Sequence, residues 1–392
     1  MKRLRRLFSV VVTLVVAGPV GAWELTDTGA PGSAIVFHKF IRGAVMTPDQ
    51  DLLPVTQFEI SVTCPKDSAC ATSGQAVRLK AHWVCPGSSA DPTCNAVDFS
   101  LETTVNGTIL FNPANVGNRT TDVPQPLCRK GYLIAWVVDE SGKPIKFDAL
   151  IGNAVIRGSQ TSARAYNALP IQAAEWLTTG DLTDSNGDGS LAFDGSEYRA
   201  ITGKIFGTIR YESTQPQVKT SLTLLTLDVI ANQPNETTQV DLNFYNEWEE
   251  LVSTSTQFIC WREVKPSRLA WGPTAAFGQK GLVESTAALQ STGPVTLVGI
   301  VETTETFTQW VTQNVPVTVC DTDQNTGQTT CLSGFSDVTV SVPGIREYAY
   351  SLSNDRTPIA TTFAPAGTPT GGGTECPPGT TFDPASETCV PD

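Results

Sequence analysis

The sequence predicts a mainly β fold: an antiparallel β-sandwich, one large or two abutting, with few short helices and with disulfide staples. Three observations lead to this prediction. Short runs of Val, Ile, Thr and aromatic residues recur between clusters of Gly, Pro, Asn and Asp, which is typical of strands and turns. Helical periodicity is nearly absent, and strands do not alternate with helices as a parallel sheet requires. The ten cysteines form an even set that suits disulfides.

The first half of the chain contains five predicted strands. In the third of them, apolar Leu79 lies between charged Arg78 and Lys80, which is typical of a strand with one face in solvent. The five candidates, in order, are Ala34–Ile41, Thr56–Thr63, Ala76–Val84, Tyr132–Val138 and Ile201–Tyr211.

The second half contains six more predicted strands. Thr220–Ile230 begins with alternation and ends almost continuously apolar, so we expect a central strand there. The other five candidates are Val240–Tyr245, Thr256–Trp261, Val295–Val301, Val315–Val319 and Val338–Val342.

Only two segments favour helix. Ala163–Leu177 is the better candidate, but Pro170 interrupts it because proline lacks the N–H that a helix interior needs. Glu247–Val252 is a candidate for a single helical turn.

We expect four segments along the chain. The sandwich region exceeds one ordinary sandwich, and a polar turn at residues 213–219 is a soft boundary within it, so one sandwich and two remain alternatives. The segments are a signal peptide (1–22), the β-sandwich region (23–352), a Thr-, Pro- and Gly-rich linker (353–375) and a disulfide-looped tail (376–392).

The first residues predict export. Four basic residues between positions 2 and 6 precede the apolar run Leu7–Val20 and the small-residue site Val20-Gly21-Ala22, so we expect cleavage after Ala22. The apolar run is too short to span a bilayer, and no second long run follows. The mature chain is therefore expected outside the cytoplasm, extracellular or at the cell surface, or in the periplasm, without a membrane span.

The charge of the chain limits its partners. The formal net charge of −13 falls to about −17 once the four basic residues of the signal are removed. Nucleic acid is excluded as a partner because phosphate binding needs clustered Lys and Arg. Cations, surface glycans and other copies of the chain remain candidate partners.

The cysteines are expected to form disulfides, because they lie in the exported part and show no CxxC spacing for zinc. Pairing by sequence proximity favours Cys64–Cys70, Cys85–Cys94, Cys320–Cys331 and Cys376–Cys389, which leaves Cys128–Cys260 by elimination.

The segment Asp184–Glu197 predicts a structural calcium site. Acceptors stand at the first, third and fifth positions of a calcium-type loop, and Gly189 follows at the sixth, where such loops turn sharply. Gly195 occupies the twelfth position in place of the closing carboxylate, so a metal-free polar turn is the alternative. The expected ligands are Asp184, Asn186, Asp188, the carbonyl of Ser190, and Asp194 or Glu197.

A second segment, Asn243–Trp261, is a candidate site for carbohydrate binding or hydrolysis. Its three glutamates beside Trp248 resemble an acidic pair with a sugar platform, whereas the alternative is an exposed acidic turn with Trp261 packed on the Cys260 disulfide. Neighbouring glutamates do not establish opposed geometry, so the acidic turn is favoured. The glutamates are Glu247, Glu249 and Glu250.

Parts of the chain resemble an uncharacterised family of exported bacterial proteins for which no activity is known. The resemblance covers most of the mature chain up to about Leu269 and implies one organised unit, without implying catalytic residues. The matching segments are AIVFHKFIRG at Ala34–Gly43, KFDALIGNAVI at Lys146–Ile156, Tyr166-Asn167-Ala168, and Phe244–Trp261 with its NEWEELVSTST core.

The sequence thus predicts a non-enzymatic exported structural, surface or adhesion protein, stabilised by disulfides and calcium. Two alternatives stand beside it. One is a carbohydrate-binding or carbohydrate-active protein; the tail resembles the last part of chitin-binding peritrophin modules, over 14 residues only. The other is a fibre subunit that donates the strand Ala34–Ile41 to a neighbour.

Overall fold

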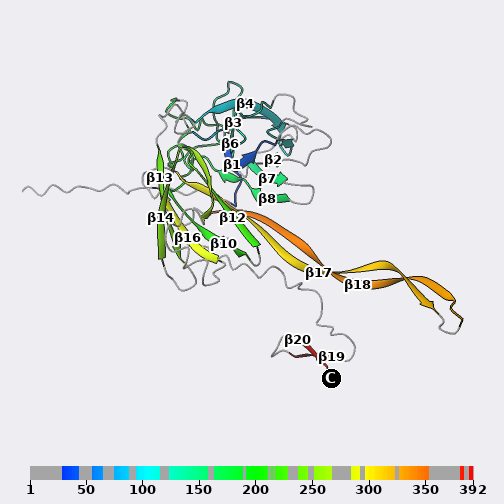
Figure 1. Cartoon of the computed structure of the whole chain (residues 1–392). Helices are drawn as coiled ribbons and strands as arrows, with labels where there is room; N and C mark the ends of the chain where they lie inside the picture. Colours follow the sequence, from blue (N-terminus) through cyan, green and yellow to red (C-terminus); the bar gives the residue numbers. More distant parts are fainter. Residues whose placement is uncertain are drawn as a thin grey trace, which may run out of the picture. The chain divides into compact units, whose positions relative to one another are not determined.

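Every named secondary-structure element in this computed structural model is a β-strand, and every strand pair is antiparallel (Figure 1). The chain divides into two compact units, residues 1–358 and 359–392. No helix among the described residues is long and apolar enough to cross a membrane. The structure describes residues 29–43, 55–64, 75–87, 94–114, 123–157, 163–188, 191–210, 213–214, 217–227, 237–245, 251–266, 284–291, 296–322, 326–352, 380–383 and 388–391.

Two sheets pack face to face in the first part of unit 1. Their inner faces supply one hydrophobic core, in which Phe37, Phe58, Trp83 and Phe111 form a contiguous aromatic cluster. One sheet has the order β4 (Ala96–Thr104), β3 (Ala76–Val84), β6 (Lys130–Val138), β1 (Ala34–Ile41), β9 (Leu169–Ile171). The other has the order β5 (Thr108–Phe111), β2 (Val55–Val62), β7 (Leu150–Arg157), β8 (Ala163–Asn167).

A second pair of sheets follows, around a core that includes Ile205, Leu222, Phe244 and Val301. The predicted sandwich is therefore two abutting sandwiches. One sheet has the order β10 (Lys204–Arg210), β16 (Glu284–Ser291), β13 (Thr238–Tyr245), β14 (Leu251–Phe258). The other has the order β11 (Ser213–Thr214), β12 (Gln217–Leu225), β17 (Val298–Thr322), β18 (Thr329–Ser351), with β15 (Trp261–Val264) also paired to β12.

A third hydrophobic cluster joins the two sandwiches. Tyr132, Ile134 and Trp136 of β6 contribute to it from the first sandwich, and Leu225 and Val298 contribute from the second. Strands β1 and β6 are consequently buried on both faces, which explains why their sequences are almost continuously apolar rather than alternating.

Strands β17 and β18 continue beyond the rest of their sheet as a long two-stranded ribbon (Figure 1). The register is unbroken from Ile300↔Ser351 to Thr322↔Thr329, and β12 covers β17 only as far as Thr306. The Cys320–Cys331 disulfide closes the ribbon near its turn, as the sequence predicts.

The predicted helix Ala163–Leu177 is wrong. Residues 163–167 form β8, and β9 continues the extended chain at the edge of the first sheet. Pro170 stands opposite Ile35 in β9, which is an edge strand. Proline is tolerated there because an edge strand has a hydrogen-bonded neighbour on one side only. Glu247–Val252 lies largely outside the described residues, and β14 begins at Leu251.

Two of the predicted disulfides are also wrong, because Cys85 pairs with Cys128 and Cys94 pairs with Cys260. Pairing by sequence proximity joined the cysteines that flank the turn between β3 and β4. However, β3 also pairs with β6 on its other edge, so Cys85, which follows β3, lies close to Cys128, which precedes β6. Cys94–Cys260 spans 166 residues and ties the first sandwich to the second. Cys64 is disulfide-bonded, and the predicted pairs Cys64–Cys70 and Cys376–Cys389 involve residues outside the described part.

The described part of the second unit is one antiparallel strand pair. Strands β19 (Thr380–Asp383) and β20 (Thr388–Pro391) run in register from Thr380↔Pro391 to Asp383↔Thr388. The linker predicted at 353–375 lies outside the described residues.

Candidate functional site

A β-bulge in β1 creates the polar centre of the molecule. The pairing of β1 with β6 shifts register between Phe37 and Phe40, and both of these phenylalanines enter the same hydrophobic core. An extra residue in one strand re-aims the side chains on either side of it. Consequently Lys39, inside an apolar strand, is directed away from the core that holds Phe37 and Phe40.

Side chains from distant strands bind the backbone groups around this bulge. The Trp261 indole N–H donates to the carbonyl of His38 at 2.9 Å. The Tyr166 hydroxyl accepts from the N–H of Lys39 at 3.1 Å and donates to the Lys39 carbonyl, and Thr56 Oγ1 accepts from the N–H of Ile41 at 2.8 Å. These bonds matter because buried backbone groups without partners are strongly destabilising.

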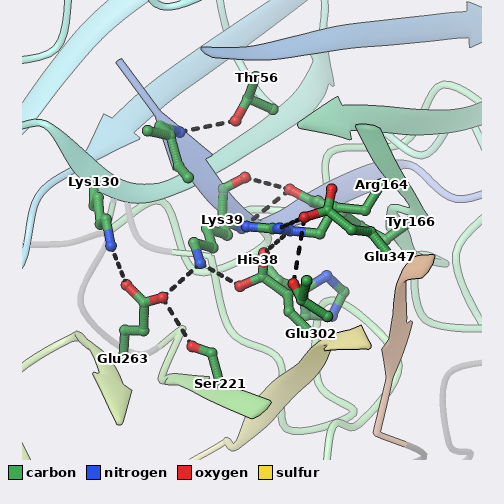
Figure 2. A network of polar contacts seen from close by, with 12 residues as sticks. His38, Lys39, Thr56, Lys130, Arg164, Tyr166, Ser221, Glu263, Glu302 and Glu347 are labelled. Atoms are coloured by element: carbon green, nitrogen blue, oxygen red, sulfur yellow. Dashed lines mark hydrogen bonds and ion pairs between the residues drawn. The ribbon is translucent and has the colours of Figure 1, made fainter. Parts of the chain in front are cut away.

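The Lys39 ammonium lies between two carboxylates of the second sandwich (Figure 2). It donates to Glu263 Oε1 at 2.7 Å and to Glu302 Oε2, while Lys39 itself is only 1% exposed. A buried ammonium of this kind is stable only when it is paired and hydrogen-bonded.

Further residues extend this pair into a larger network. Arg164 Nε donates to the second oxygen of Glu302 at 2.6 Å, and its Nη1 donates to Glu347 Oε1 at 3.3 Å. Glu263 also accepts from the Lys130 ammonium and from the Ser221 hydroxyl, the latter at 2.8 Å. We call Lys39, Lys130, Arg164, Glu263, Glu302 and Glu347 the buried ion network.

The buried ion network balances its charge and joins the two sandwiches. Its three cations come from β1, β6 and β8, and its three carboxylates come from β15, β17 and β18. Burial raises the pKa of Glu263, but the charges of Lys39 and Lys130 outweigh it and lower this pKa to about 2. The carboxylate is thus charged over the whole physiological range, and its charge is neutralised within the chain.

His38 lies beside the network but takes no part in its hydrogen bonds. The residue is fully buried, neither ring nitrogen has a hydrogen-bond partner, and the ring packs edge-on against Tyr166 with centroids 5.8 Å apart. Burial lowers the pKa of His38 to about 3, so the ring is neutral at physiological pH.

Most of the predicted calcium ligands have partners within their own turn. Asn186 Nδ2 donates to Asp188 Oδ2 at 3.0 Å, and Asn186 Oδ1 accepts from the N–H of Asp188 at the same distance. Asp194 Oδ1 accepts from the N–H and the hydroxyl of Ser196, so Asp194 is committed to a local turn. Ser190 lies outside the described residues.

Glu197 differs from the other candidates. It is 2% exposed; Oε2 accepts from the N–H of Ala192 at 3.1 Å, and Oε1 is buried without a hydrogen-bond partner. Burial raises the pKa of Glu197, and the negative charges of Asp184 and Asp188 raise it further, against the opposing effect of nearby backbone N–H groups. The carboxylate of Glu197 therefore lies within electrostatic reach of both aspartates.

The loop is anchored on both sides of these carboxylates. Leu191 and Phe193 enter the cluster between the sandwiches, and the Thr183 hydroxyl donates to the buried Tyr198 hydroxyl at 2.9 Å. In the described part of the chain, no group of three or more His, Cys, Asp and Glu side chains is close enough together to hold a metal ion.

Sequence reasoning missed the buried ion network. Its one visible signal was Lys39, a charged residue in the otherwise apolar run AIVFHKFI. Nothing local marks Glu263 or Glu302, because their partners stand 224 and 263 residues away. Of the proposed sugar-binding segment, residues 246–250 lie outside the described part, while Trp261 is buried beside the Cys260 disulfide, as the alternative expected.

Comparison with known proteins assigns no family. No protein-family model matches the chain, and no curated protein matches it. Among solved structures, a protein of Thermotoga maritima (Crystal Structure of Thermotoga maritima 1070) shares 14% identity, over 34% of this chain and 91% of its own, with a TM-score of 0.18. A likeness with so low a TM-score carries no argument about this chain.

Removing one member of the buried ion network should destabilise the whole of unit 1. We expect Glu302→Gln to lower the free energy of unfolding by about 3 kcal/mol, because Lys39 and Arg164 each lose a buried charged partner. Glu102→Gln is the control, since the exposed Arg78–Glu102 pair at 3.7 Å is worth less than about 1 kcal/mol. Urea unfolding measures both; equal effects would contradict the structural role of the network.

Acid should destabilise the protein through His38. Its folded pKa of about 3 lies below the unfolded value of 6.5, so the unfolded chain takes up the proton first as pH falls. The contribution of His38 to the free energy of unfolding is fully present above pH 6.5. As the pH decreases from 6.5 toward the folded pKa of about 3, this contribution falls by about 1.4 kcal/mol per pH unit. In urea unfolding between pH 7 and pH 4, His38→Phe should remove a slope of that size, while His82→Phe provides a second histidine for comparison. An unchanged slope in His38→Phe would refute this assignment.

Proposed function

We propose that this protein is a non-enzymatic exported structural protein, a surface or adhesion component whose two sandwiches are tied together by buried charges, disulfides and a calcium-stabilised loop. The observation that carries the proposal is the buried ion network. Its carboxylates include the buried Glu302, and each of the three is paired to a cation of the other sandwich. Carboxylates neutralised in this way serve cohesion rather than proton transfer.

The cysteines support the exported setting. Disulfide-bonded cysteines indicate an oxidising compartment, and the link between Cys94 and Cys260 constrains the same pair of sandwiches as the buried ion network. In the chain-entropy description, closing a loop of this length stabilises a fold by roughly 5 kcal/mol. This chemistry and the predicted signal peptide both support the proposed extracellular, cell-surface or periplasmic residence.

Calcium is proposed for the loop because of Glu197. A buried carboxylate oxygen without a hydrogen-bond partner, near two further carboxylates, is stabilised by a cation. Calcium prefers such hard oxygen ligands and accepts irregular geometry. Glu197, Asp184 and Asp188 would supply carboxylates, and the ion would fasten the loop that Leu191 and Phe193 anchor to the cluster between the sandwiches.

Cell fractionation tests the exported structural role. In cells that make the protein naturally, we expect the chain in the extracellular, surface or periplasmic fraction, beginning at Trp23. Peptide mapping without reduction should recover the Cys85–Cys128 and Cys94–Cys260 links. A reduced chain in the cytoplasm would contradict the proposal, and specific retention by one polysaccharide on a glycan array would favour the carbohydrate-binding alternative.

Calcium titration tests the loop. Calcium at about 1 mM, the range of extracellular sites, should raise the melting temperature of the mature chain and give a binding heat. Glu197→Gln should abolish both responses, yet leave the calcium-free protein as stable or more stable, because it removes a buried like charge. Glu175→Gln, at an exposed position nearby, is the matched control. The same calcium response in both variants, or none in the parent chain, would end the calcium proposal.

A further inference from the structure

The outer part of the β17–β18 ribbon has two chemically different faces. Side chains alternate between faces along a strand, so Val311, Val315, Val317 and Val319 lie on one face, and Leu332 stands opposite Val319 in the register. We call this set the valine face. Val319 and Leu332 are 66% and 74% exposed.

The opposite face is hydroxyl-rich. Cross-strand pairs bring Thr312 Oγ1 within 3.2 Å of Thr339 Oγ1, and Thr318 Oγ1 within 3.3 Å of Ser333 Oγ. Hydroxyl groups in such pairs can form hydrogen bonds with water, so these pairs do not need to be buried by a partner. We call these four residues the threonine face; Trp310 and Phe335 share it but stand apart, opposite Ser341 and Pro316.

The strand register continues from the valine face toward the sandwich. Positions 338, 340 and 342 of β18 stand opposite Gln313, Val311 and Gln309. Phe307 begins this face, and its ring covers Gly344, where an added Cβ would meet the ring at 2.6 Å. Arg346 lies 4.7 Å from the centroid of the same ring and ends the uncharged stretch.

The ribbon exposes more than its own structure requires. In the described residues, β18 is the only strand that pairs with β17 beyond Thr306, and β18 is the edge strand of its sheet. Two-stranded ribbons are marginally stable in water unless one face is covered, and exposed apolar faces mark interaction surfaces.

The lack of charged residues on the ribbon distinguishes among the partners that could cover the valine face. Between Phe307 and Val319 the sequence has no charged residue, and between Leu332 and Gly344 it has only Asp337, whose partner Asn314 alternates onto the threonine face. Nucleic acid and anionic lipid surfaces both need Lys and Arg, which are missing here. A second copy of the chain, with net charge −13, approaches with least repulsion where the surface is uncharged.

We infer that the valine face docks against the valine face of a second copy, giving a two-fold dimer in which the two ribbons stack as sheets do in a sandwich. Identical uncharged faces are self-complementary about a two-fold axis, and stacked sheets lie about 10 Å apart. This self-association goes beyond the proposed role as a structural, surface or adhesion protein. It also differs from a strand-donating fibre, because β1 is paired within its own chain to both β6 and β9.

The area of the valine face sets the expected affinity of the dimer. From Phe307 to Val319 the ribbon is about 43 Å long at about 3.3 Å per residue, and two strands make it about 10 Å wide. Docking would bury on the order of 1,000 Å² in total, the lower bound for a specific interface. The dimer should therefore be concentration-dependent, with a dissociation constant in the micromolar range or weaker.

Sedimentation velocity of the full mature chain, over two orders of magnitude of concentration, tests this inference. We expect a monomer–dimer equilibrium whose dissociation constant rises at least tenfold in Val319→Lys/Leu332→Lys. The control is Thr318→Lys/Ser333→Lys, which adds the same charge at the same height of the ribbon on the threonine face. It should leave the dissociation constant within about twofold.

Three outcomes would overturn the inference. They are a parent chain that stays monomeric throughout, equal effects of the two lysine pairs, or a monomer that floats with neutral phosphatidylcholine vesicles only when the valine face is intact. The last would identify a lipid surface as the occupant. Unchanged thermal unfolding of both variants serves to separate lost docking from lost folding, since all four substituted positions are exposed.

Discussion

The architecture depends on one buried ammonium group. Lys39 sits where the two sandwiches meet, and its charge tolerates that position only because Glu263 and Glu302 arrive from the second sandwich. The desolvation of an unpaired ion amounts to several kcal/mol, so an arrangement that separated the sandwiches without solvating Lys39 would be strongly disfavoured. The directional bonds of the network act at this interface together with the apolar cluster and the Cys94–Cys260 disulfide.

The same region shows how local irregularity and long-range packing support each other. The bulge in β1 turns Lys39 out of the hydrophobic core, and the backbone groups around the bulge are bound by Trp261, Tyr166 and Thr56 from three other strands. Trp261 reaches its carbonyl from a sharp corner, in which Cys260 has a φ of 64° and is held by the disulfide to Cys94. Strain at that corner is thus offset by contacts that only the assembled pair of sandwiches provides.

The interior and the exterior of unit 1 differ in how their polar groups are used. Inside, the three cations and three carboxylates of the buried ion network balance one another in charge. Outside, the loop at 184–197 holds a buried carboxylate near two others, and the ribbon presents an uncharged apolar face to solvent. Both places carry the proposals made above for an ion and for a second copy of the chain.

The sequence by itself determined the class of fold, because alternation, turn residues and apolar runs are local properties read over a few positions. Ala34–Ile41, Ala76–Val84 and the stapled tip at Cys320–Cys331 could be predicted for that reason. Only the tertiary structure decided which cysteines pair across the sandwiches and what faces Lys39. Those partners are up to 263 residues away and are selected by how the sheets pack, which no local pattern encodes. The helix predicted at Ala163–Leu177 failed for the same reason, since pairing with β1 and β7 outweighs weak local propensity.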